Sequence, residues 1–126
     1  MNTPTKPFEH IYVYLTGFKT IADGDIMALL SMDGYSKFAF SPVMVKAPKT
    51  DAELLEPIDK CFKDILKQHK PQIHSRGITF ITNLPADLEP HISSLLEPNH
   101  IIIINEALTK REIQPVVNGL TKFMNK

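Results

Sequence analysis

Three aspartates lie close together in the first third of the chain, and carboxylates at such spacing can hold divalent metal ions. Asp23 and Asp25 flank a glycine, and Asp33 follows soon after. Carboxylates that hold a pair of Mg²⁺ or Mn²⁺ ions support phosphoryl transfer, the chemistry of nucleases and strand-transferases. Asp23 and Asp25 fall in an expected loop, however, and Asp33 falls at an expected turn, where aspartate is common because it hydrogen-bonds locally. We favour the turn interpretation for all three.

Other residues that could do chemistry occur singly. The five histidines show neither the i,i+4 pairing nor the Cys/His spacing of a zinc site; they are His10, His69, His74, His91 and His100. Cys61 has no accompanying pattern of a catalytic His and Asn, so we expect it to be a buried structural residue. No glycine-rich phosphate-binding loop of either common type is present.

The composition is that of a soluble globular domain. The chain has 126 residues, of which 43% are apolar, and its 14 basic and 14 acidic residues cancel. No bulk charge attracts DNA or a membrane, so DNA binding would require local clustering of Lys and Arg. One cysteine, no signal peptide and no apolar run near the roughly 20 residues of a membrane span lead us to expect a cytoplasmic protein that does not enter a membrane.

The first third of the chain has the alternation of a three-stranded meander. We expect strands near 8–18, 26–32 and 38–46, joined by a loop at 19–25 and by a turn at Asp33-Gly34. Pro42 places the third strand at a sheet edge or marks a bulge. We expect the residues before this meander, 1–7, to be a flexible N-terminal arm.

From Lys49 the apolar period lengthens to that of a helix. Thr50 and Glu53 form a capping box, and Pro57 predicts a kink or a late helix start. Short strand segments at 72–74 and 78–82 and a short helix at 85–96 follow.

The last quarter of the chain contains one strand and one helix. The run His100–Asn105 is apolar on both faces, which is typical of a central strand covered from both sides. A second capping box, Thr109 to Glu112, predicts the start of the terminal helix. The whole order predicts an α/β fold: a five-stranded mixed sheet with an antiparallel meander, then alternating helix and strand, flanked by helices.

Four segments carry a resemblance to a known family. They are the turn Asp33-Gly34-Tyr35-Ser36-Lys37-Phe38 between two apolar runs, Tyr14–Thr20, Ile73–Phe80 and Gln114–Leu120. Together they resemble the catalytic core of retroviral integrases and transposases, which has the ribonuclease-H-like fold. The resemblance covers nearly all of the chain at low identity, and it implies one integrase-core-like domain over residues 8–126.

In active members of that family, three carboxylates hold the metal ions. The resemblance places Tyr14, Ser75 and Asn118 at the three carboxylate positions of this chain. All three side chains are uncharged at neutral pH and offer only weak dipoles to a divalent cation. We therefore expect no catalytic residue, no metal and no cofactor. The implied function is that of an inactive core that serves as a DNA-binding or assembly module of a mobile-element protein.

Two alternatives remain open. An active metal-dependent nuclease or strand-transferase would need relocated carboxylates, with Asp25, Asp33 and one later Glu converging on Mg²⁺ or Mn²⁺. Glu9 and Glu112 are further acidic candidates, although the capping role explains Glu112 more simply. The second alternative is a pure protein-interaction domain that dimerises and does not bind nucleic acid, which the neutral net charge favours.

The expected partners are DNA and a second copy of the chain. Lys60, Lys63 and Lys67 share one helical face, and Arg76 lies beyond that helix. A solvated surface is the default interpretation of these residues, and contact with DNA phosphates is the alternative. Integrase-type cores commonly pair through a helix of the core, so the resemblance also implies a homodimer.

Overall fold

The computed structural model describes residues 4–5, 7–20, 24–46, 49–68, 77–96, 98 and 100–124. In chain order the elements are the strands β1 (His10–Thr20), β2 (Gly24–Asp33) and β3 (Val43–Lys46), the 3₁₀ turn η1 (Asp51–Leu54), the helix α1 (Leu55–Gln68), β4 (Thr79–Thr82), the 3₁₀ turn η2 (Ala86–Leu88), α2 (Glu89–Ser94), β5 (Ile101–Ile104) and α3 (Glu106–Met124). This order confirms the predicted meander followed by alternating helix and strand, while the strand segment expected at 72–74 lies outside the described residues.

The five strands form one mixed sheet in the order β3-β2-β1-β4-β5. β1 is the central strand: it pairs antiparallel with β2 from Ile11 to Thr20 and parallel with β4 over its first residues, His10 to Val13. β3 extends the antiparallel side, and β5 extends the parallel side. The predicted five-stranded mixed sheet is therefore confirmed.

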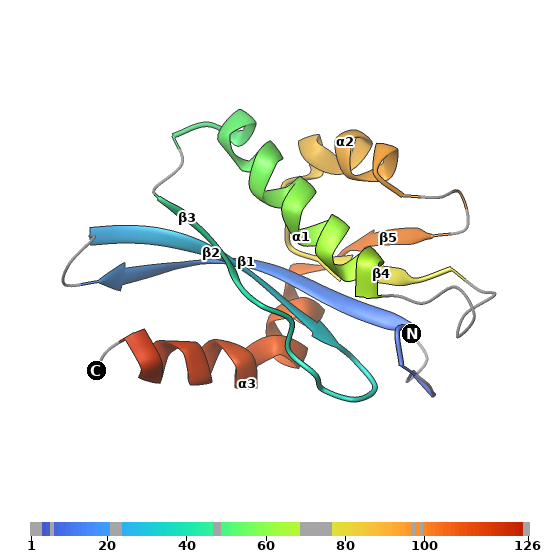
Figure 1. The fold of residues 1–126 in the computed structure, drawn as a ribbon, viewed down its shortest axis with the longest axis horizontal. Helices are drawn as coiled ribbons and strands as arrows, with labels where there is room; N and C mark the ends of the chain where they lie inside the picture. Colours follow the sequence, from blue (N-terminus) through green and yellow to red (C-terminus); the bar gives the residue numbers. More distant parts are fainter. Residues whose placement is uncertain are drawn as a thin grey trace.

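Helices cover both faces of the sheet, as predicted (Figure 1). α1 and α2 lie on one face, where Ile58, Phe62 and Ile92 pack against the sheet in the larger core cluster. α3 lies on the other face and buries Ile113 against β1, β2 and β4. Alternate β1 residues divide between the two cores, because successive side chains of a strand point to opposite faces.

The turn after β2 forms where the Asp-Gly pair predicts it, but the strand that follows begins later than expected. The Lys37 N–H donates to the Asp33 carbonyl at 2.9 Å. Residues 38–42 are irregular apart from one bridge between Met32 and Ala39, and β3 begins only at Val43. Pro42 lacks an N–H for a ladder, which accounts for the short strand, and β3 does lie at a sheet edge.

Prolines do not interrupt the helices on the α1 face. The capping box of Thr50 and Glu53 opens η1, and α1 then starts at Leu55, so Pro57 falls in its first turn. Pro90 likewise lies in the first turn of α2. The first-turn N–H groups have no partner within a helix, so proline costs little there, and the late start predicted for α1 is confirmed.

Two predictions for the last quarter are wrong. β5 is not a central strand; it forms the outer edge of the sheet, with Ile101 55% and Ile104 39% exposed. α3 does not begin at Thr109 either, because Asn105 caps it by accepting the Leu108 N–H at 3.0 Å. Thr109 lies inside the helix, where its hydroxyl donates to the Asn105 carbonyl at 2.7 Å.

Candidate functional site

The place where a mixed sheet of this order would hold a ligand is the carboxyl end of β4, next to the centre of β1. β4 ends at Thr82, opposite Val13, while β1 continues to Thr20. The Asn83 side chain occupies the next position of the ladder. Its Nδ2 donates to the Leu15 carbonyl at 2.8 Å, and its Oδ1 accepts the Leu15 N–H at 2.7 Å. We call this pair of hydrogen bonds the Asn83 clasp.

The polar groups of Thr82, next to the Asn83 clasp, are engaged in hydrogen bonds as well. The side-chain amide uses its oxygen and one N–H on Leu15, so it replaces one further residue of β4. The Thr82 hydroxyl, which is fully buried, accepts the Leu84 N–H at 3.1 Å. The Thr82 carbonyl accepts the Asn105 N–H at 2.9 Å. The polar groups at this point therefore hold strand ends together.

Of the three positions that the family resemblance assigns to carboxylates, the two that the structure describes lie in different surroundings. Tyr14 lies in mid-β1 and is buried in the core beneath α3. Asn118 is exposed on α3, where its Oδ1 accepts from Gln114 Nε2 at 2.9 Å. Ser75, like Arg76, lies outside the described residues. A buried tyrosine and an exposed asparagine do not form a metal-binding pair.

The aspartates of the active alternative also lie apart. Asp25 and Asp33 stand at opposite ends of β2, which separates them by eight residue steps, or roughly 26 Å at the usual rise of a strand. Asp23 and the Asp25 side chain lie outside the described part. Among the described residues, no group of three or more His, Cys, Asp or Glu side chains is gathered closely enough to hold a metal ion.

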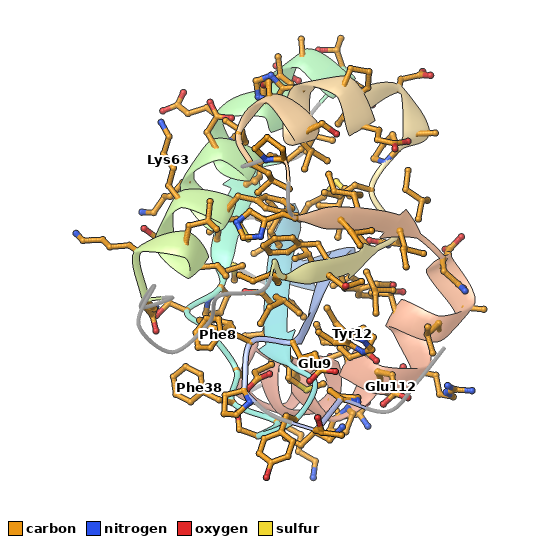
Figure 2. All side chains as sticks on the ribbon, turned by 90° about the vertical axis from the view of Figure 1, so that its right-hand side faces the viewer. Phe8, Glu9, Tyr12, Phe38, Lys63 and Glu112 are labelled. Carbon is orange, nitrogen blue, oxygen red and sulfur yellow. The ribbon has the colours of Figure 1, made fainter. Side chains whose placement is uncertain are left out.

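Asp33 organises the turn after β2. Its buried carboxylate accepts the N–H groups of Phe8 and Tyr35, at 3.2 and 3.3 Å, and the Ser36 hydroxyl at 2.7 Å. The turn it supports exposes Tyr35 and Phe38. Phe8 and Phe38 both pack edge-on against Phe40, and Figure 2 shows them on the same side of the molecule. This confirms the structural interpretation of Asp33.

A second polar group joins this turn to α3. Lys37 Nζ lies 3.8 Å from Glu112 Oε2, so Glu112 has a tertiary role rather than the expected capping role. Glu112 also lies near Tyr12 (Figure 2). Burial, and then the Glu112 charge, raise the pKa of the Tyr12 phenol, while the Arg111 charge partly offsets this. His10, two residues before Tyr12 on the same strand, is buried, and its Nδ1 has no hydrogen-bond partner among the described residues.

The lysines proposed for DNA contact are exposed on the outer face of α1. Lys60, Lys63 and Lys67 point away from the sheet, and Figure 2 shows Lys63 projecting into solvent. Glu56 and Asp64 are exposed on the same helix and dilute the positive charge. The helical spacing that predicted a shared face is confirmed, but the face carries mixed charge.

Two remaining candidates have structural roles. Burial raises the pKa of the Cys61 thiol to about 12, which keeps it protonated and unreactive at neutral pH. His91 Nε2 lies 2.7 Å from Asp59 Oδ1 and ties α2 to α1. No helix within the described ranges is both long enough and apolar enough to cross a bilayer.

Sequence reasoning missed Asn83, the residue that occupies the candidate site. The only signal was an asparagine directly after a short apolar strand, a pattern that also fits an ordinary turn. Which backbone it would meet depends on β1 extending past β4, a tertiary feature. A comparison with models of known protein families finds no match, and a comparison with curated protein sequences finds no relative either.

Proposed function

We propose that this chain is a ribonuclease-H-like domain of the integrase and transposase core type, which works without metal chemistry as an assembly module of a mobile-element protein. The proposal combines the family resemblance of four segments with the strand order and helix placement described above. An antiparallel meander followed by helix, strand, helix, strand and helix is the order of that fold.

The Asn83 clasp is the observation that carries the proposal. Phosphoryl transfer by two metal ions needs negatively charged oxygen ligands close to the substrate phosphate. The polar group at the carboxyl end of β4 is a neutral amide, whose oxygen already accepts the Leu15 N–H. Tyr14 is uncharged and buried among apolar side chains. These donors do not fit a pair of divalent cations, so we derive no catalytic step from this site.

The test is an assay of metal-dependent nicking on supercoiled plasmid DNA, with Mg²⁺ or Mn²⁺ present. We expect that the protein does not nick the plasmid in an EDTA-sensitive way. The matched variants are Asp25→Asn and Asp51→Asn, because the active alternative depends on Asp25, whereas Asp51 is an exposed aspartate outside the proposed carboxylate set. EDTA-sensitive nicking that is lost in Asp25→Asn but kept in Asp51→Asn would overturn the proposal.

DNA retention is the second candidate function, and the exposed lysines of α1 favour it. Phosphate contacts weaken steeply with salt, so retention of duplex DNA should be measured at several salt concentrations. If α1 contacts DNA, a Lys60→Gln, Lys63→Gln, Lys67→Gln variant loses retention and the salt slope falls by about three. A Lys110→Gln, Lys122→Gln variant, altered at exposed α3 positions, is the control. No retention at low salt leaves assembly as the function.

A further inference from the structure

The two edges of the sheet differ in their protection. β3 is preceded by Pro42, and the irregular residues 38–42 shorten it. β5 consists of four isoleucines, with no charge, proline or bulge to discourage pairing with another strand. β5 is the last strand of the described sheet, and α2 and α3 lie over its two faces instead of along its outer edge (Figure 1).

The outer edge of β5 presents backbone groups in a defined pattern. The N–H groups of Ile101 and Asn105 turn inward and donate to β4 and its continuation, each at 2.9 Å. Alternation along a parallel strand then turns the N–H and C=O groups of Ile102 and Ile104 outward. An added strand would therefore form its hydrogen bonds with these two residues.

We propose that β5 pairs antiparallel with β5 of a second copy of this chain, so that two sheets join into one across a twofold axis at Ile103. This register sets Ile102 opposite Ile104 of the second copy, and Ile104 opposite its Ile102. In each of these pairs, the N–H of each residue donates to the C=O of the other. The role of this dimer rests on the proposed assembly function. Its partner is a second copy of the chain, and its surface is the outer edge of β5.

The side chains near β5 are self-complementary in this register. A cavity of about 340 Å³ lies beside the strand, and both polar and apolar residues line it: Glu89, Ser93, Leu96, Pro98, His100 and Ile102. Ile104, on the same face and 39% exposed, would lie opposite Ile102 of the second copy, next to that cavity.

Cysteine cross-linking tests the register. Residue 103 would face itself across the twofold axis in a pair without hydrogen bonds, where the Cα atoms lie about 4.5 Å apart, close enough for a disulfide. We expect Ile103→Cys to form a disulfide-linked dimer under mild oxidation. Ile101→Cys is the control: its side chain is more exposed, but it would face Asn105 of the second copy. Faster cross-linking of Ile101→Cys than of Ile103→Cys would overturn the proposed register.

Sedimentation equilibrium tests the dimer itself. We expect Ile104→Lys to weaken dimerisation about tenfold or more, because it places a charged side chain directly opposite the apolar Ile102 side chain of the second copy. Met44→Lys on the opposite edge strand, 45% exposed in the wild type, should leave it unchanged. Circular dichroism confirms that both variants fold.

Amide exchange locates the contact. In the dimer, the Ile102 and Ile104 amides should exchange more slowly as the protein concentration rises. A chain that stays monomeric at millimolar concentration, or a dimer whose stability does not change in Ile104→Lys, would overturn the proposed β5 pairing. Neither result would affect the conclusion that the domain works without metal chemistry. Metal-dependent nicking by a β5-paired dimer would instead overturn the proposed function alone.

Discussion

At the scale of single residues, this protein uses polar groups to close strand ends and turns. The Asn83 amide replaces a residue of β4, and the Asp33 carboxylate holds the turn after β2. The sequence predicted Asp33, because the Asp-Gly pattern is local and its hydrogen bonds lie within a few residues. It did not predict Asn83, because Asn83 bonds to a backbone 68 positions away.

Gly34 is required by close approach to β1. A Cβ atom at this position would lie 2.8 Å from Cε2 of Tyr12 and 3.3 Å from the His10 carbonyl oxygen. We expect Gly34→Ala to lower the free energy of unfolding by about 1–3 kcal/mol, measured by urea denaturation. Gly119→Ala is the control, because open space surrounds that helical position and alanine should stabilise it by about 1 kcal/mol. Equal effects of the two variants would contradict this packing.

At the scale of elements, the order and type of the strands and helices followed from hydrophobic period, but position within the sheet did not. A run that is apolar on both faces predicted a central β5, whereas the strand lies at the edge. Periodicity describes which faces of a strand are covered and carries no information on its lateral neighbours. An apolar edge is consistent with a further strand pairing there.

Two local sequence patterns could each mark the start of α3, and in the structure Asn105 caps the helix. The motif from Thr109 to Glu112 is a sound capping pattern, but Asn105 directly follows β5, and its side chain already caps the helix. We expect Asn105→Ala to destabilise the fold by about 1 kcal/mol in urea denaturation. Asn118→Ala, at an exposed position of α3, should change stability by less than about 0.5 kcal/mol. A larger loss in Asn118→Ala than in Asn105→Ala would contradict the cap.

At the scale of the whole molecule, the two cores share the central sheet, and in each core burial raises the pKa of one side chain. Cys61 lies in the core beneath α1 and α2, and Tyr12 lies in the core beneath α3. Burial is the main cause of the raised pKa in both, so the folded state favours the neutral thiol and the neutral phenol. The Glu112 charge adds to this effect at Tyr12, and a hydrogen bond from Ser31 opposes it at Cys61.

Global stability should therefore decline in alkaline solution. For each group, the folded pKa exceeds the unfolded one, so its stabilising contribution is complete below the unfolded pKa and falls as pH rises toward the folded pKa. For Cys61 this window runs from 9.0 to about 12, and for Tyr12 it opens at 10.0. Within its window, one such group lowers the free energy of unfolding by about 1.4 kcal/mol per pH unit.

Urea denaturation between pH 8 and pH 11 measures this decline. The Cys61→Ala, Tyr12→Phe double variant removes both ionisations, so its free energy of unfolding should fall less steeply with pH than that of the wild type. Tyr35→Phe is the matched control, because Tyr35 is exposed at the turn after β2 and should leave the slope unchanged. The quantity compared is the slope of the free energy of unfolding against pH. The cavity left by Cys61→Ala lowers this free energy by the same amount at every pH, so it does not change the slope. Parallel curves for the wild type and the double variant would mean that neither core excludes the charged form.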